Sequence, residues 1–165
     1  MNTAPNSRAD LLARLNADVA PGTFAAALGL RFVEATLDNV VAHVEVPLDY
    51  ISRPSVVHGG VLMAIADTVG GFATRINLQP AQRTTTIESK TNFLRSAAPG
   101  RLLSAKAKAL HKGRTIMVWQ TVISDQKNRN IAVTTQTQLV IDASLAKVSN
   151  PVEQTCQTLP RSTPI

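Results

Sequence analysis

Residues 58–76 read HGGVLMAIADTVGGFATRI, an apolar stretch long enough for about five helical turns. Apolar side chains stand on nearly every side of such a helix, so it lacks the broad polar face of a surface helix and has to be wrapped by protein on most sides. The small residues Ala64, Ala66, Gly70 and Gly71 let other backbone approach closely. The stretch is therefore predicted to be the central helix of the core.

The sequence on either side of this helix predicts one curved antiparallel sheet. Apolar residues at helical spacing over residues 8–19 predict an amphipathic lid helix, and one more helical turn follows near Phe24. Strand patterns surround the turn at Asp38-Asn39, which predicts a hairpin. Four further strand-like segments follow the central helix, separated by turn-forming sequences, at 84–94, 102–111, 115–124 and 131–141. This order predicts an α+β fold in which the sheet wraps the helix.

Composition limits the kind of protein. The 165 residues, 44% of them apolar, suit one domain, and the longest apolar runs are far short of the ~20 residues that cross a bilayer. With no apolar signal region at the N-terminus, we expect a cytoplasmic protein without a membrane partner. The lone Cys156 cannot close an intrachain disulfide, and His43 and His111 lack partners for a metal site.

The net charge of +6 favours an anionic partner. Aromatic residues make up only 4% of the chain, so stacking platforms for nucleic acid are poorly supplied and no nucleic-acid partner is expected. A phosphorylated small molecule fits the charge as well.

The start of the central helix carries the chemistry. The first N–H groups of a helix have no internal acceptor, and glycine at His58-Gly59-Gly60 lets a substrate oxygen approach them, as an oxyanion hole requires. Asp67 follows about two turns later, roughly 12 Å along the axis from Gly59. Either these groups do not cooperate, or a second subunit completes the site.

Three motifs resemble the hotdog-fold thioesterases of the phenylacetic-acid-degradation (PaaI-like) type. They are the HGG with an acid nine residues after the histidine (57–68), the strand at 86–100 with Phe93-Leu94-Arg95, and Lys112-Gly113-Arg114. The resemblance runs from about residue 24 to 141. It implies a hydrolase of acyl- or aroyl-CoA thioesters, EC 3.1.2.-, whose sites are shared across a homodimer, with two dimers commonly forming a homotetramer. We expect an N-terminal helical segment at 1–22, the hotdog thioesterase domain at 23–142 and a flexible tail at 143–165.

The resemblance also implies roles for individual residues. Asp67 would attack the thioester carbonyl or activate water, the Gly59 N–H would polarise that carbonyl, and His58 would shape the same end of the site. Thr86 keeps the hydroxyl of a serine that assists hydrolysis in some relatives, whereas Ser52 stands where many relatives carry Asn or Gln. The residues implied to hold coenzyme A are Arg95, Ser96, Lys112, Gly113 and Arg114. No metal and no cofactor are expected, since coenzyme A is part of the substrate.

Two other functions stay open at this stage. A hotdog protein that binds acyl-CoA without turning it over is compatible with Ser52, whose side chain is shorter than Asn or Gln. A hotdog dehydratase or hydratase ranks last, because those families have different spacings of acid and histidine.

Overall fold

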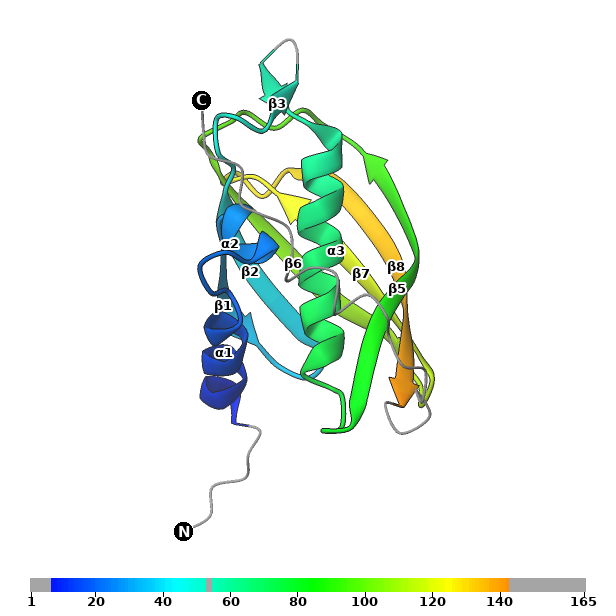
Figure 1. The fold of residues 1–165 in the computed structure, drawn as a ribbon. Helices are drawn as coiled ribbons and strands as arrows, with labels where there is room; N and C mark the ends of the chain where they lie inside the picture. The colour runs from blue at the N-terminus through cyan, green and yellow to red at the C-terminus, as the bar shows by residue number, and fades with distance from the viewer. Residues whose placement is uncertain (1–6, 53–54, 143–165) are drawn as a thin grey trace, which may run out of the picture.

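The computed structural model describes residues 7–52 and 55–142, in which a six-stranded antiparallel sheet curves around one long helix (Figure 1). The helix is α3, Gly59–Arg75. The strands lie in the order β1-β2-β6-β7-β8-β5 and comprise Leu30–Ala35 (β1), Asn39–Glu45 (β2), Gln82–Phe93 (β5), Leu102–Lys112 (β6), Ile116–Ser124 (β7) and Asn130–Asp142 (β8). The predicted α+β arrangement is therefore confirmed. The expected tail at 143–165 lies outside the described residues.

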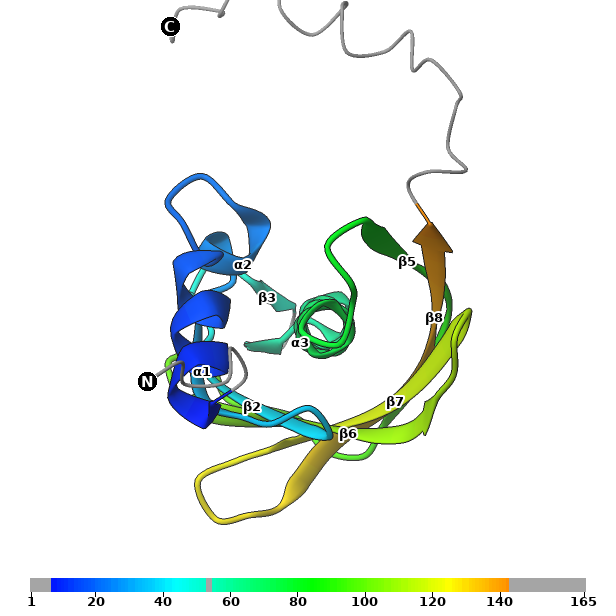
Figure 2. The same cartoon turned by 90° about the horizontal axis from the view of Figure 1, so that it is seen from below.

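Among the described residues, the central helix is covered on one side only. Its buried residues, among them Leu62, Ile65 and Val69, face the concave sheet, which curves around α3 when the molecule is seen along the helix (Figure 2). The opposite face holds Met63, 39% exposed, and the half-buried Asp67. Wrapping on most sides was expected, so the open face is where the structure departs from the sequence pattern.

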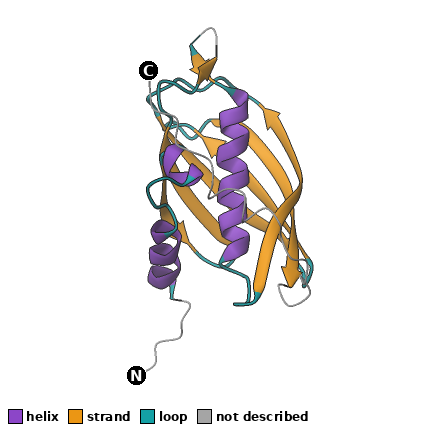
Figure 3. Ribbon diagram, viewed as in Figure 1, coloured by secondary structure: helices purple, strands orange, loops and turns teal. Residues whose placement is uncertain are grey.

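The first helix covers the far edge of the sheet rather than the open face of α3. Helix α1, Arg8–Ala17, lies beside β1 (Figure 3) and buries Leu11 and Leu15. The Asn16 side chain acts as a strand partner there: its amide donates to the Phe32 carbonyl at 2.9 Å, and its oxygen accepts from the Phe32 N–H at 3.0 Å. The expectation of a lid is therefore wrong, because these contacts tie α1 to β1, at the edge opposite β5.

Three short elements precede the central helix along the chain. Helix α2, Phe24–Ala27, is the expected single turn, whereas β3, Ile51–Ser52, and β4, Val56–Val57, form a small separate ribbon. The ribbon fixes the start of α3, because the His58 N–H donates to Tyr50 and the Val57 N–H donates to Ala97. In the described part of the chain, no helix combines the length and apolar character that crossing a bilayer requires.

The core beneath α3 contains polar side chains as well as apolar ones. Gln136 and Gln138 of β8 are 0% and 1% exposed and point toward the helix. The amide of Gln136 lies against Gly70, where an added Cβ would come within 2.4 Å of its Oε1. Gly70 therefore leaves the space that the buried glutamine occupies.

Alanine at each of the two neighbouring helix glycines gives a matched test of this packing. Gly70→Ala is expected to destabilise the protein by about 1–3 kcal/mol, because the buried Gln136 amide cannot withdraw without losing its partners. Gly71→Ala meets no atom within 4 Å, so it should gain up to about 1 kcal/mol of helix propensity. Urea denaturation of the two variants measures the difference, and equal stabilities would contradict the proposed packing.

Candidate active site

Asp67 is held by donors from two strands. The Thr86 hydroxyl on β5 donates to Asp67 Oδ1 at 2.9 Å. The Gln136 amide on β8 donates to the Asp67 carbonyl at 3.1 Å and reaches Oδ1 at 3.4 Å. Asp67 is half-buried on the open side of α3 and lines a cavity of about 270 Å³ together with Thr86, Gln138, Gly71 and Phe72. A carboxylate at the wall of a cavity, fixed through one oxygen, is suited to act as a base or a nucleophile.

The start of α3 has a free backbone donor. His58 caps the helix, because its Nδ1 accepts from the Gly60 N–H at 2.9 Å and its carbonyl accepts from Val61 and Leu62. No acceptor among the described residues is recorded for the Gly59 N–H. The cap satisfies Gly60 and leaves Gly59 available for a substrate oxygen.

The predicted residues Ser52, Arg95 and Ser96 gather around Gly59. All four line a cavity of about 390 Å³ that also includes Phe93. The Ser52 hydroxyl points into its own ribbon and donates to the Val56 carbonyl at 3.4 Å. Arg95 is anchored at the start of β8, where its guanidinium donates to the Asn130 carbonyl at 2.9 Å.

A third cavity adjoins this one and carries basic residues that the sequence reasoning missed. It measures about 320 Å³, shares Ser96 and Ala97 with the Gly59 cavity, and is lined by Arg101, Lys127 and Arg129. These cations come from two separate loops, so no local run of charge marks them in the sequence. Arg129 is paired at 2.7 Å with Asp125, which lines the same cavity, so Arg95, Arg101 and Lys127 are the cations that make the neighbourhood of Gly59 suited to phosphate groups.

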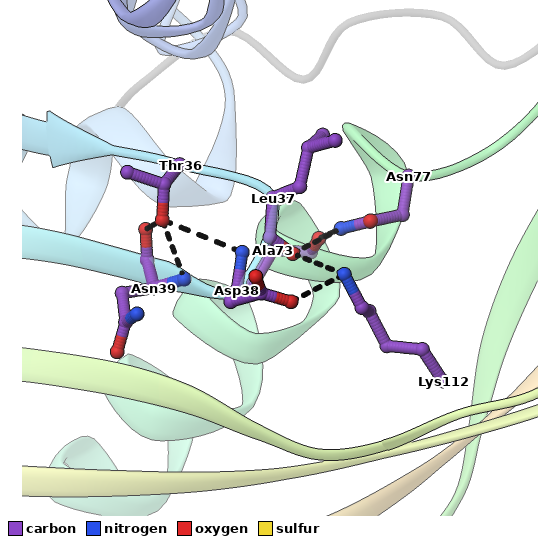
Figure 4. A network of polar contacts seen from close by, with 7 residues as sticks. All are labelled: Thr36, Leu37, Asp38, Asn39, Ala73, Asn77 and Lys112. Carbon is purple, nitrogen blue, oxygen red and sulfur yellow. Dashed lines mark hydrogen bonds and ion pairs between the residues drawn. The ribbon is translucent and has the colours of Figure 1, made fainter.

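The motif Lys112-Gly113-Arg114 lies at the other end of the sheet. Lys112 forms an ion pair with Asp38, and its Nζ donates to the Leu37 carbonyl at 3.3 Å, beside the end of α3 (Figure 4). The Asn77 amide donates to the same carbonyl at 2.9 Å. Lys112 thus ties the β1–β2 turn to the end of β6, and Asn77 ties it to the end of α3.

Distances along the strands separate the predicted residues into distinct groups. The Arg95 N–H donates to the Ile131 carbonyl, and the Val140 N–H donates to the carbonyl of Thr115, in the turn that follows Lys112. Ile131 and Val140 are nine residues apart on β8, so the two basic groups lie about 30 Å apart along this strand. Gly59 and Asp67 line different cavities, about 12 Å apart along the helix axis. Within one chain, therefore, Asp67 is hydrogen-bonded to Thr86, and Gly59 shares a cavity with Ser52, Arg95 and Ser96. These two groups of residues do not contact each other.

Sequence reasoning also missed the glutamines beneath Asp67. Their signal is Gln at two alternate positions of one predicted strand, which places Gln136 and Gln138 on the same face. Which face is buried, however, is not readable from that strand alone. The described residues include no group of three His, Cys, Asp or Glu side chains positioned to hold a metal ion.

Comparisons with known proteins agree with this architecture. The pattern of the thioesterase superfamily matches residues 55–132. The 1,4-dihydroxy-2-naphthoyl-CoA hydrolase of Escherichia coli is 31% identical over 120 residues, which are 72% of this chain and 85% of that protein. A thioesterase structure from Haemophilus influenzae superposes with a TM-score of 0.76 at 27% identity, over 83% of this chain and 94% of that one.

A further solved structure bears on the fold alone. The PaaI protein from the phenylacetic acid degradation operon of Escherichia coli superposes with a TM-score of 0.73 at 21% identity, over 82% of this chain and 96% of that one. This likeness confirms the expected fold, and the expected resemblance to thioesterases is confirmed by the superfamily pattern and by the hydrolase of Escherichia coli.

The β7–β8 turn beside the basic cavity depends on one carboxylate. The Arg129 N–H and the Arg129 side chain donate to Asp125, the Lys127 N–H donates as well, and these bonds hold the pKa of the Asp125 carboxyl below its usual value of 3.8. Because the pKa is lowered in the folded protein, the ionised carboxyl stabilises the fold at pH values above its ordinary pKa. This stabilisation is lost as the pH falls through the lowered pKa.

Asp125→Asn is therefore expected to lower the melting temperature at neutral pH. The difference from the wild type should shrink as the pH falls below about 4, because the unfolded chain takes up the proton first and the folded protein follows at a lower pH. Thermal unfolding across this pH range measures the effect. A difference that stays constant with pH would show that the charge of Asp125 does not stabilise the turn.

Proposed function

Because the chain belongs to the thioesterase superfamily and is a thioester hydrolase, we propose that it hydrolyses an acyl- or aroyl-CoA thioester to the free acid and coenzyme A. The observation that carries the proposal is Asp67, a carboxylate fixed by Thr86 at a cavity wall on the open face of α3. The basic side chains around the Gly59 cavity support coenzyme A as the thiol, since arginine donates paired hydrogen bonds to phosphate.

A second copy of the chain can complete the site through β5. This strand ends the sheet, so one edge of it has no neighbour within residues 7–52 and 55–142, and Ile87 and Phe93 on it are 54% and 52% exposed. In an antiparallel pair of β5 strands, the Phe93 end of one lies toward the Gln82 end of the other. Gly59 lies beside Phe93 and Asp67 beside Thr86. Gly59 of each chain is thereby brought toward the partner's Asp67.

The same pairing brings the two basic ends together. Arg95 follows the Phe93 end of β5, whereas Lys112-Gly113-Arg114 lies near its Gln82 end, beside Val140. In the homodimer these groups come from different chains and approach the same site. Coenzyme A is then held by residues of both subunits.

The chemistry uses the carbonyl carbon of the thioester. The Gly59 N–H donates to the carbonyl oxygen and stabilises the negative charge that develops on it. Asp67 either takes a proton from water as the water oxygen bonds to the carbonyl carbon, or bonds to that carbon itself and forms an anhydride that water then cleaves. In both routes the carbon–sulfur bond breaks, and the thiolate of coenzyme A leaves and takes up a proton.

Variants at two positions test the proposal through thiol release from a panel of acyl- and aroyl-CoA thioesters. Asp67→Asn should abolish turnover. Gly59→Pro should lower kcat by about 10²- to 10³-fold, because proline at the first helical position removes the N–H but keeps the helix. Gly59→Ala is the matched comparison: it retains the N–H and should lose less rate than Gly59→Pro, although its Cβ would lie 3.2 Å from the Phe93 ring. Ligand-induced thermal stabilisation without thiol release would instead support a non-catalytic binding protein.

Mixing two inactive variants tests the shared site. Asp67→Asn and Gly59→Pro chains, unfolded together and refolded in equal amounts, form mixed dimers that each keep one intact site if the groups come from different subunits. Activity should then return to about a quarter of the wild-type value. No recovery is possible if Gly59 and Asp67 of the same chain work together, so an inactive mixture of folded dimers would reject the shared site.

A further inference from the structure

A chain of hydrogen bonds runs from the sheet to Asp67. The Thr84 hydroxyl donates to Gln138 Oε1 at 2.9 Å, and Gln138 Nε2 donates to Thr86 Oγ1 at 2.6 Å. Thr86 in turn donates to Asp67 Oδ1 at 2.9 Å. Gln138 is 1% exposed, so its amide has no solvent to replace either partner.

The direction of this chain follows from the charge on Asp67. An ionised carboxylate can only accept, so the single proton of the Thr86 hydroxyl must point toward Oδ1. The Thr86 oxygen can then only accept, which obliges Gln138 to present its NH₂ group to Thr86 and its oxygen to Thr84. Each member of the chain is consistent with an ionised Asp67.

The two carboxylate oxygens of Asp67 consequently differ. Oδ1 accepts from Thr86 and lies within 3.4 Å of Gln136 Nε2, whereas no hydrogen bond to Oδ2 is recorded among the described residues. Of the residues lining this cavity, Arg75 is the other charged one, and its guanidinium pairs with Asp18 at 3.1 Å. The polar support of Asp67 therefore comes from neutral side chains of β5 and β8.

We propose that Gln138 is a positioning residue, which holds the Thr86 hydroxyl toward Asp67 Oδ1 and so favours the ionised carboxylate with Oδ2 as the reacting oxygen. The inference deepens the proposed function and rests on it, because Oδ2 is a reacting oxygen only in a protein in which Asp67 takes part in the hydrolysis. Gln138 itself touches neither the substrate nor the reacting atoms. Its effect passes through Thr86.

Gln138→Met tests the proposal with little risk to the fold. Methionine has a similar length and flexibility, and Thr84 retains the Leu139 carbonyl as an acceptor at 3.1 Å. We expect kcat to fall by about three- to tenfold with KM nearly unchanged, and the measured midpoint of the Asp67 carboxyl titration to move to higher pH. The titration is followed by ¹³C NMR of labelled aspartate, with Asp67→Asn to assign the signal, and so does not depend on turnover.

Combining the variants shows whether Gln138 acts through Thr86. Thr86→Val should raise the same midpoint, and adding Gln138→Met to it should cause no further rise, whereas Thr86→Ser should restore both rate and midpoint. Thr91→Val is the matched control, because it removes the 2.8 Å hydroxyl bond between Thr91 and Thr134 of the same two strands. That variant should leave the Asp67 midpoint where it is.

Each outcome decides the proposal. An unchanged midpoint in folded Gln138→Met, or an equal rise in the wild-type and Thr86→Val backgrounds, overturns the role of Gln138. If the wild type releases no thiol but the midpoint still depends on Thr86 and Gln138 in the expected way, the proposed function fails and the hydrogen-bond chain stands. Should Gln138→Met unfold, Thr84→Val provides the milder test, since it removes only the outer donor, and an unchanged midpoint there again counts against the chain.

Discussion

A carboxylate carried on a largely buried helix needs hydrogen-bond donors from whatever packs against it, and this requirement organises the centre of the protein. Asp67 obtains them from Thr86 and Gln136, on the two adjacent strands β5 and β8. Gly70 is small because the Gln136 amide lies against it. Helix α3 and the strands β5 and β8 thus pack together around the side chain of Asp67.

For the proposed reaction, the same arrangement leaves a single chain incomplete. The Gly59 N–H and the Asp67 carboxylate belong to one helix, and the rise of an α-helix keeps them about 12 Å apart. No movement of side chains removes that separation. The edge of β5 and the open face of α3 are the surfaces through which a second copy can supply the missing half, which is why the proposed activity and the proposed dimer depend on each other.

Much of this fold is readable from local patterns. The apolar stretch predicts α3, and period-two alternation predicts the long strands β5 to β8 to within about two residues. The same reasoning singles out Gly59 and Asp67 as candidates, whereas the roles proposed for them come from the resemblance to thioesterases. It fails for α1, whose amphipathic pattern shows that one face is buried but does not say against what. Asn16 ties that helix to Phe32, and only the folded chain brings those residues together.

The sequence alone determined the elements, the apolar helix and the residue types available for chemistry, since these follow from contacts within a few residues along the chain. Which face of β8 points inward was decided by the tertiary structure. Val133, Leu139 and Ile141 share one face of that strand and look more like core than Thr134, Gln136 and Gln138 on the other, yet the polar face is the buried one. The side-chain NH₂ groups of Gln136 and Gln138 are satisfied there by Asp67 and by Thr86, the cross-strand neighbour of Gln138. Hydrogen bonds between residues some 50 to 70 positions apart leave no mark in the local pattern.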